Sequence, residues 1–191
     1  MGDIVEQIMA RRSIRKYTEE PVAREDVRRL LEAAMAAPSA SNRKPWEFIV
    51  VDDPDVLARL RRGLVLGRYN APLAIAVCGN MRRAHPPPAR DFWIEDCSAA
   101  AQNILLAATG MDLGSVWIGV HPVGPLIAHV RRALHLPGHI RPLGVLYIGH
   151  PAQRKPPRTQ YDERRVRWQV YAAQPPKRPW WKWWARDEPE E

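Results

Sequence analysis

Apolar positions along the chain fall either at helical spacing or in short continuous runs, and this pattern predicts the elements of the fold. Helical spacing predicts helices over residues 3–10, 25–37, 91–109 and 125–134. A further helix is expected after Asp53, which can cap a first turn that contains Pro54. Short apolar runs predict strands over residues 48–51, 73–78, 115–120 and 143–148, of which the first two are expected to be buried.

The order of these elements predicts an α+β fold. Four strands stand among five or six helices, without the strict alternation of a doubly wound sheet. We therefore expect a layered sandwich in which a central mixed or antiparallel sheet is flanked by helices. The long helix is expected to end with Gly110 as its cap. Its small-sided run Ser98–Ala101 lets a neighbouring helix approach closely, which places it at the centre of the domain or of a dimer.

The character of the chain changes near its end. Residues 1–168 are expected to form one domain, and residues 169–191 a Pro- and Trp-rich C-terminal arm. The arm holds four of the eight tryptophans, Trp180, Trp181, Trp183 and Trp184. Tryptophans among basic groups suit a membrane surface, but the acidic residues 187–191 would be repelled by anionic lipid. We favour an arm that packs these rings on a partner subunit.

Composition excludes several classes of function. The net charge is +8, but the basic residues are spread along the chain and no nucleic-acid-binding motif is present. Phosphate groups on a cofactor and a nucleotide substrate explain the charge better. No apolar run approaches a membrane span, and no signal peptide is evident, so we expect a cytoplasmic protein. Cys78 lies in an apolar strand-like run and Cys97 in a helix-like run, and both are expected to be buried, inert thiols in a reducing compartment.

Several kinds of site are also missing from the sequence. The histidines lack metal-ligand spacing, since Pro137-Gly138 separates His135 from His139, so no metal site is expected. No G-x-S-x-G elbow is present, and no G-x-G-x-x-G fingerprint marks a dinucleotide-binding domain. A dinucleotide substrate would therefore bind transiently.

Three segments carry groups suited to chemistry. The first, residues 11–17, combines guanidinium groups, which match phosphate oxygens in two-point geometry, with the hydroxyl of Ser13. The second, residues 38–48, is a turn of small polar groups that can bond the edge of a planar heterocycle, followed by a strand. The third, residues 117–120, places Gly119 at a strand end, where a backbone N–H can approach a ligand. Taken singly, the arginines could be a solvated helix end and the serines ordinary turn residues.

In their order and spacing these segments resemble the nitroreductase family of FMN enzymes, over about residues 3–168. The resemblance implies a homodimer in which one subunit binds FMN through Arg11, Arg12, Ser13 and Arg15, and the other covers it with Pro38, Ser39, Ala40, Ser41 and Asn42. It also places Ile118 and Gly119 beside flavin N5 and Arg158 near the phosphate. The family's Asn and Lys at the pyrimidine edge have no clear counterpart in residues 63–70, where Arg68 is one candidate for the charge and Arg15 another.

The implied activity is that of an FMN-dependent oxidoreductase. NAD(P)H would deliver hydride to flavin N5 and leave, and an electron-poor acceptor of the nitroaromatic or quinone type would then take its place in a ping-pong cycle. The flavin carries the electron chemistry, so no catalytic side chain is assigned. Alternatives are reduced-flavin chemistry such as flavin fragmentation or dehalogenation, and a non-enzymatic flavin-binding or membrane-surface protein. The short, proline-rich interval Gly79–Asp91 argues against an elaborate lid. The choice between NADH and NADPH stays open.

Overall fold

The computed structural model describes residues 3–64 and 67–171 of the chain. It contains two compact units, one ending at Arg158 and one beginning at Thr159. In the second unit, Asp162 accepts a hydrogen bond from the backbone N–H of Arg164 and begins the short 3-10 helix η4 (Glu163–Arg165). The domain boundary at residue 168 stays a prediction. So does the packing of the arm, because its four tryptophans lie outside the described residues.

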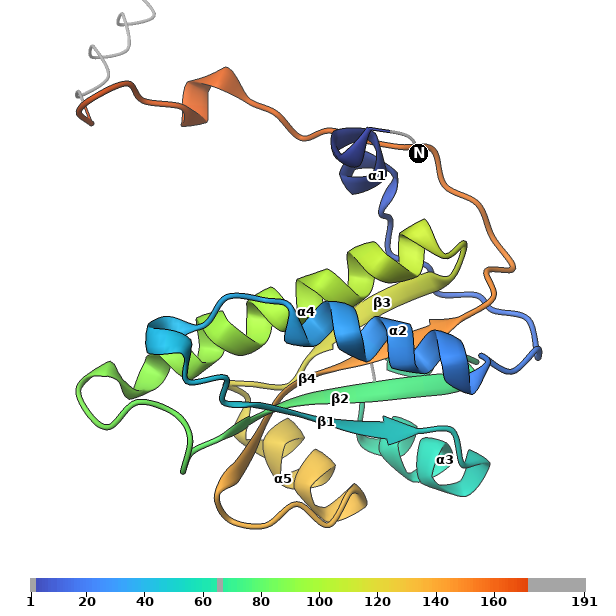
Figure 1. Ribbon diagram of the computed structural model, residues 1–191. Helices are drawn as coiled ribbons and strands as arrows, with labels where there is room; N and C mark the ends of the chain where they lie inside the picture. The colour runs from blue at the N-terminus through green and yellow to red at the C-terminus, as the bar shows by residue number, and fades with distance from the viewer. Residues whose placement is uncertain (1–2, 65–66, 172–191) are drawn as a thin grey trace, which may run out of the picture. The chain divides into compact units, whose positions relative to one another are not determined.

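A four-stranded antiparallel sheet in the order β1-β2-β4-β3 forms the centre of the first unit (Figure 1). The strands are β1 (Trp46–Val51), β2 (Leu73–Asn80), β3 (Gly114–Gly119) and β4 (Ile140–Gly149). All eight residues of β2 are buried, which confirms the predicted buried strand. The expectation that β1 is also buried is wrong, since Val50 is 38% exposed. Among the described strands only β2 pairs with β1, so β1 is an edge of the sheet.

Helices cover both faces of this sheet (Figure 1). On one face lie α2 (Arg24–Met35) and α4 (Phe92–Gly110), and on the other lie α3 (Pro54–Gly63) and α5 (Gly124–Ala133). Each layer has its own apolar core against the sheet, one around Trp93 and Leu146 and one around Leu60 and Tyr147. The predicted layered α+β sandwich is therefore confirmed, and the sheet is antiparallel throughout.

The long helix α4 is the centre of this domain. Eight of its 19 residues are buried, among them the full indole of Trp93. Cys97 lies on its inner side and donates a hydrogen bond to the carbonyl oxygen of Cys78. Both cysteines are buried and unpaired, as expected. Burial raises the pKa of the Cys78 thiol to about 12, so it stays protonated and unreactive.

Of the two helix caps predicted from the sequence, the structure confirms one and contradicts the other. Asp53 caps α3 as expected, because its side chain accepts hydrogen bonds from the N–H groups of Asp55 and Val56. The expectation that Gly110 caps α4 is wrong, since Gly110 is the last helical residue. The chain leaves the helix through Asp112, whose φ of 56° is left-handed. Aspartate tolerates this conformation better than most residues, because its short polar side chain can bond locally.

The N-terminal helix α1 (Ile4–Ala10) has an uncovered apolar face. Ile4, Val5, Ile8 and Met9 are 62%, 47%, 48% and 38% exposed, and no residue of the helix is buried. A contiguous apolar surface of this kind marks a site of association. In the part of the chain that the structure describes, no helix is both long and apolar enough to cross a bilayer.

Candidate functional site

The basic segment, residues 11–17, runs along the outer edge of β3. Ser13 forms a parallel bridge with Ser115, and the N–H of Ile14 donates to the carbonyl oxygen of Ser115 at 2.9 Å. The segment therefore extends the sheet beyond its edge strand. Neighbouring side chains of an extended segment point in opposite directions, so Arg11, Ser13 and Arg15 are expected to share one side.

Tyr17 fixes the far end of the basic segment. Its ring is buried, and its hydroxyl donates to the carbonyl oxygen of Ile14 at 2.5 Å. Burial raises the pKa of this phenol, so the hydroxyl remains a donor. Asn70 holds the Tyr17 backbone from the other side. Its Oδ1 accepts from the N–H at 3.1 Å, and its Nδ2 donates to the carbonyl oxygen at 2.7 Å.

A return segment, residues 150–158, leaves β4 and runs back beside the basic segment. Backbone N–H groups donate across the pair from Thr18 to His150, from Ala152 to Lys16 and from Arg158 to Met9, at 2.9–3.1 Å. The ammonium group of Lys155 also donates to the carbonyl oxygen of Ser13 at 2.6 Å. These bonds hold residues from the beginning and the end of the domain's sequence side by side.

The two segments gather five cations: Arg11, Arg12, Arg15, Lys155 and Arg158. Burial lowers the pKa of Arg11, and the guanidinium groups of Arg12 and Arg158 lower it further. The pKa of Lys155 is lowered by burial first, and then by the charges of Arg15, Arg12 and Arg158. Within residues 3–64 and 67–171, none of the five forms an ion pair with a carboxylate. Cations that repel one another without a counter-charge form a site for an anion, and a phosphate suits arginine geometry best.

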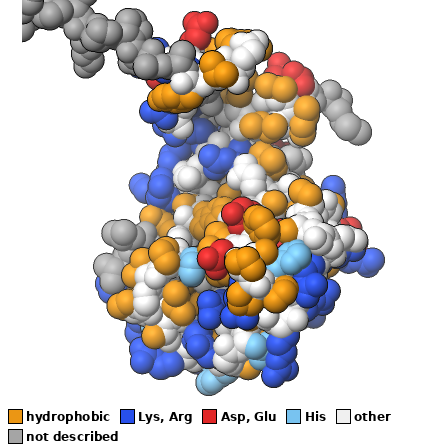
Figure 2. All heavy atoms as spheres, turned by 90° about the vertical axis from the view of Figure 1, so that its left-hand side faces the viewer, with side chains coloured by type: hydrophobic (Ala, Val, Ile, Leu, Met, Phe, Trp, Pro, Cys, Tyr) orange, Lys and Arg blue, Asp and Glu red, His pale blue; other side chains and the backbone are white. Residues whose placement is uncertain are grey.

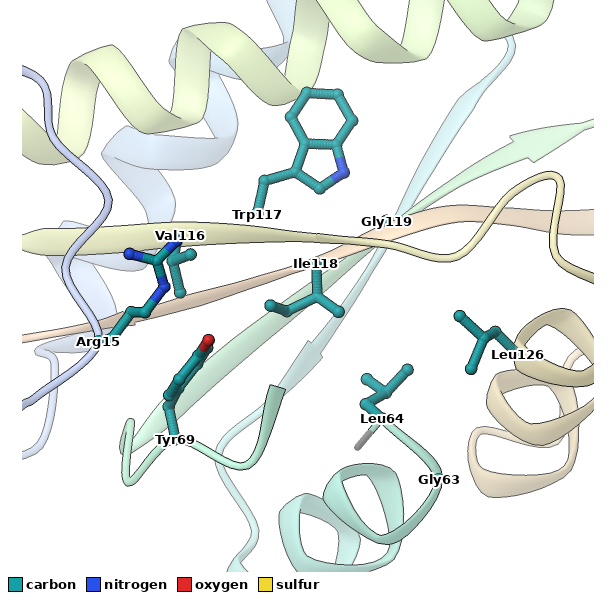
Figure 3. A pocket seen from close by; sticks show the side chains of 9 residues that line it. All are labelled: Arg15, Gly63, Leu64, Tyr69, Val116, Trp117, Ile118, Gly119 and Leu126. Atoms are coloured by element: carbon teal, nitrogen blue, oxygen red, sulfur yellow. The ribbon is translucent and has the colours of Figure 1, made fainter. Parts of the chain in front are cut away.

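A cavity of about 390 Å³ opens beside this basic group, at the end of β3 (Figure 3). Its wall consists of Arg15, Gly63, Leu64, Tyr69, Val116, Trp117, Ile118, Gly119 and Leu126. Ile118 and Leu64 face one another across it, and the guanidinium group of Arg15 lies at one side, above the ring of Tyr69. An apolar cavity with a single cation at its rim suits a planar ring that carries or gains negative charge at one edge.

The backbone of β3 offers free groups to this cavity. Along an antiparallel strand the N–H and C=O groups of successive residues point alternately to the two sides. The N–H of Val120 donates to Leu143 at 3.1 Å, towards β4, whereas the carbonyl of Ser115 points outward to Ile14. Gly119 has the same parity as Ser115, so its N–H points away from β4. A Cβ atom at Gly119 would meet nothing within 4 Å, so its backbone is open to a ligand.

The polar turn, residues 38–44, lies at the other end of the domain. It contains the 3-10 helix η1 (Ala40–Asn42). Ser41, Asn42 and Lys44 have φ values of 48°, 53° and 49°, in the left-handed region that non-glycine residues avoid. The turn is held by the side chain of Asp96 in α4, whose Oδ1 accepts from the N–H of Ala40 at 2.7 Å.

The basic segment and the polar turn do not meet within one chain. The turn is bonded to Asp96 near the start of α4, whereas α1, which leads into the basic segment, contacts α4, and its Gln7 lies beside Gly110 at the far end. Asp96 and Gly110 are separated by about 21 Å of helix at 1.5 Å per residue. The polar turn and the start of the basic segment therefore lie near opposite ends of α4.

The face that carries the start of α4 is itself partly apolar. Figure 2 shows hydrophobic side chains gathered at the centre of this face, with Lys and Arg along its lower edge. Phe92 and Val123 are 48% and 49% exposed, at the starts of α4 and α5. Each end of α4 thus combines one group of candidate site residues with exposed apolar side chains.

The structure therefore groups the predicted site residues in two sets. One set holds Arg11, Arg12, Ser13, Arg15 and Arg158 of the basic group, with Ile118 and Gly119 of the cavity that Arg15 also lines. The other set holds Pro38, Ser39, Ala40, Ser41 and Asn42 of the polar turn. Arg68 is exposed and does not line the cavity, so Arg15 is the better candidate for charge at its rim. Residues 65 and 66 of the same loop lie outside the described residues.

Sequence reasoning missed four residues of the site. Lys155 stands in the basic run Arg154–Arg158, where only its proximity to Arg158 could have pointed to it. Tyr69 and Asn70 gave no signal, because their roles depend on how the loop folds back. Asp96 stands within the predicted helix 91–109, where no local pattern marks it as a partner of the polar turn. Among residues 3–64 and 67–171, no three potential ligands are grouped to hold a metal ion.

Comparison with known proteins gives consistent matches. The model of the nitroreductase family matches residues 8–68 and 63–150 of this chain. A protein of Methanothermobacter thermautotrophicus that bears the name NADH dehydrogenase/NAD(P)H nitroreductase is 40% identical over 166 residues, which cover 86% of this chain and 85% of that protein.

Solved structures are similar over nearly the whole domain. A protein of the same name from Parabacteroides distasonis has a TM-score of 0.84 at 40% identity, and the match covers 90% of this chain and 100% of that one. An FMN-dependent nitroreductase from Clostridium difficile has a TM-score of 0.79 at 32% identity, covering 87% and 99% of the two chains.

Proposed function

Because this chain belongs to the nitroreductase family of oxidoreductases, we propose that it is a homodimeric FMN enzyme that oxidises NAD(P)H and reduces an electron-poor acceptor. The acceptor class we propose is nitroaromatic or quinone, taken in a ping-pong cycle. The family and the fold expected from the sequence are thereby confirmed.

The observation that carries the proposal is the group of five cations beside the cavity. Arg11, Lys155 and Arg158 would hold the phosphate of FMN. Its charge would relieve the repulsion that, after burial, lowers the pKa of Arg11 and Lys155. Each charge-assisted hydrogen bond contributes roughly 1.5–3 kcal/mol. The residues therefore fit FMN better than a flavin without phosphate.

The cavity would hold the ring of the cofactor. Bound FMN supplies two-electron chemistry, accepting hydride from NAD(P)H and passing electrons to the second substrate. Arg15 would stabilise negative charge at one ring edge, and the free N–H of Gly119 would orient the ring. None of the nine lining residues is a carboxylate, a histidine or a cysteine. The chain's task is therefore to bind, orient and exclude water, and we assign no catalytic side chain.

The separation of the two groups of site residues supports the homodimer. A second copy related by a two-fold axis would bring its polar turn, with Ser39 and Asn42, to the cavity beside Arg15. The exposed apolar face of α1 and the apolar surface at the start of α4 would then be covered together. The same pairing forms two equivalent sites.

The compartment we propose is the cytoplasm. The buried, unpaired thiols of this chain suit such a reducing compartment.

Flavin affinity and anaerobic reduction test this function. The protein should bind FMN at least about a hundredfold more tightly than riboflavin, since two or more charge-assisted bonds are lost without the phosphate. Under anaerobic conditions NADPH or NADH should bleach the flavin absorbance, and a quinone should restore it. Equal affinity for the two flavins would overturn the phosphate site. A flavin that neither nucleotide bleaches would leave a binding protein in place of an enzyme.

Mixed dimers test the shared site. Arg12→Glu should damage the basic group and Asn42→Asp the polar turn, so each homodimer should bind FMN poorly. A mixed dimer of the two has one site with both intact segments and should recover up to half of the binding. If confirmed mixed dimers recover none, the two segments do not serve a common site.

A further inference from the structure

Asp96 is a buried carboxylate whose hydrogen bond goes to the backbone of the polar turn. Its side chain is 6% exposed, and among the described residues it forms no ion pair. Its bond is to a backbone group, since Oδ1 accepts from the N–H of Ala40 at 2.7 Å. A carboxylate in such a place loses solvation and must be compensated by a hydrogen bond. Burial raises the pKa of Asp96, while the Ala40 bond opposes that shift.

The polar turn needs such an anchor. Three of its residues have left-handed φ values without being glycine, and such a backbone persists only when its surroundings hold it. Three bonds within the turn set its local shape: the backbone N–H groups of Asn42 and Arg43 donate to the carbonyl oxygens of Ser39 and Ala40, and the N–H of Lys44 donates to Ser39 Oγ at 3.0 Å. They do not fix its place relative to the rest of the fold. Two other bonds do: Asp96 accepts from the N–H of Ala40, and the Arg43 side chain donates to the carbonyl oxygen of Arg83 at 2.7 Å. Arg83 is exposed, whereas Asp96 belongs to α4, which has the most buried residues of the described helices.

We propose that Asp96 is a positioning residue for the flavin site: through Ala40 it holds the Ser39–Asn42 turn where it covers the FMN bound by the partner subunit. This inference rests on the proposed function, in which the turn completes a site in the second chain. Asp96 touches neither cofactor nor substrate in this scheme. Its effect reaches the partner's site directly through the turn, whereas the basic segment of its own chain follows α1, which lies beside the other end of α4, about 20 Å along the helix.

Three substitutions separate positioning from general stability. Asp96→Ala removes the acceptor, whereas Asp96→Asn keeps an oxygen that can accept from Ala40. The matched control is Asn103→Ala, which removes a bond from the same helix to a backbone group elsewhere. The Nδ2 of Asn103 donates to the carbonyl oxygen of Ala33 at 3.0 Å, away from the turn.

The expected results differ between these variants. Asp96→Ala should raise the FMN dissociation constant roughly tenfold or more and lower kcat/KM in FMN-saturated enzyme. Asp96→Asn should stay within about threefold of the natural chain, because the acceptor is retained. Asn103→Ala should lower the melting temperature without changing either flavin property. If Asp96→Ala and Asn103→Ala behave alike, Asp96 is merely structural and the proposal fails.

A second variant removes the same bond from its donor side. Ala40→Pro deletes the N–H and leaves the helix core intact. Ser39 is already extended, with φ −145° and ψ 150°, as a residue before proline must be. If Asp96→Ala does not fold, this variant carries the test. It should reproduce the loss of FMN affinity, and natural affinity in Ala40→Pro would overturn the proposal.

Mixed dimers and amide exchange complete the design. A dimer of one Asp96→Ala chain and one Arg11→Glu chain has one site with both intact segments, so it should bind about half as much FMN as the natural dimer. No recovery would mean that Asp96 acts within its own subunit. Without FMN, amide exchange over residues 40–44 should be faster in Asp96→Ala than in Asn103→Ala. Equal exchange rates in the two variants would contradict only the proposed role of Asp96. A natural chain that does not bind FMN would instead contradict the proposed function.

Discussion

The two ends of α4 carry the two halves of the proposed site, and each half is destabilised in a different way. At the C-terminal end the backbone is well bonded, and the unfavourable interaction is repulsion among five cations. At the N-terminal end the unfavourable interaction is in the backbone, where Ser41, Asn42 and Lys44 are left-handed. One half stores electrostatic energy and the other stores conformational strain.

This difference determines how each half responds to a ligand. A phosphate neutralises the cations directly, so the basic half should gain stability when FMN binds. The polar turn gains no such stability from FMN, because its backbone strain is offset within its own chain by the hydrogen bond to Asp96. Substitutions in the basic half should therefore change affinity more than folding, and substitutions in the turn should change both.

The largest effect is expected from Arg11→Gln. Loss of one charge-assisted phosphate contact should weaken FMN binding roughly 10- to 100-fold. The apoprotein should be as stable as before or slightly more so, because Arg11 is destabilised by Arg12 and Arg158. Calorimetric titration and thermal melts check both. Arg59→Gln, at an exposed position of α3, is the control and should change neither. A loss of apoprotein stability in Arg11→Gln would contradict the electrostatic account.

A smaller effect on binding and a larger one on folding are expected from Asn70→Ala. This change removes both bonds that hold the Tyr17 backbone. The free energy of unfolding should fall by roughly 1–2 kcal/mol, which lowers the melting temperature by about 2–4 °C per kcal/mol. FMN affinity should fall less than in Arg11→Gln, because the cations remain. An unchanged melting temperature would show that the basic segment does not need this support.

The pH dependence of the basic half should have opposite signs for folding and for binding. The pKa of Lys155 is lowered in the folded apoprotein. Between this lowered pKa and the ordinary lysine pKa of about 10.4, the unfolded chain therefore binds more protons than the folded one. Apoprotein stability should therefore improve as pH rises from the lowered pKa towards the ordinary one. FMN affinity should fall over the same interval, since the phosphate prefers a charged Lys155.

Lys155→Gln provides the control for this pH experiment. Melts and FMN titrations of the variant should lose the part of the pH dependence that belongs to the lysine. If both proteins show the same profile, another group is responsible. Buffer anions should be kept low in these measurements, because phosphate or sulfate would occupy the same cations.

Much of the fold could be predicted from the sequence, because its signals are local. Apolar spacing located each strand and each main helix to within a few residues. It could not show that β1 is an edge strand, since strand order is decided by tertiary pairing. It also misplaced the end of α4, where the left-handed residue is Asp112 and not glycine.

The candidate site also contains residues that local patterns indicate and residues that only tertiary packing reveals. Arg15, Ile118 and Gly119 were named from motifs, and the structure brings them to one cavity. Tyr69 and Asn70 could not be named, because no local pattern reports where a loop packs. Asp96 escaped notice for a related reason. Asp96 becomes a buried acceptor only because the polar turn folds against it in three dimensions.

The smallest effect, and the sharpest test of the strained half, is expected from Ser41→Gly. At a φ of 48° glycine avoids a steric penalty of roughly 1–2 kcal/mol, but it loses about 0.5–1 kcal/mol through greater freedom in the unfolded chain. The net gain should be below about 1 kcal/mol, seen as a slight rise in melting temperature. Ser41→Ala keeps the Cβ atom and should give no rise, and a similar rise would refute strain as the cause. A relaxed turn also depends less on its anchor, so Asp96→Ala combined with Ser41→Gly should lose less stability than Asp96→Ala alone.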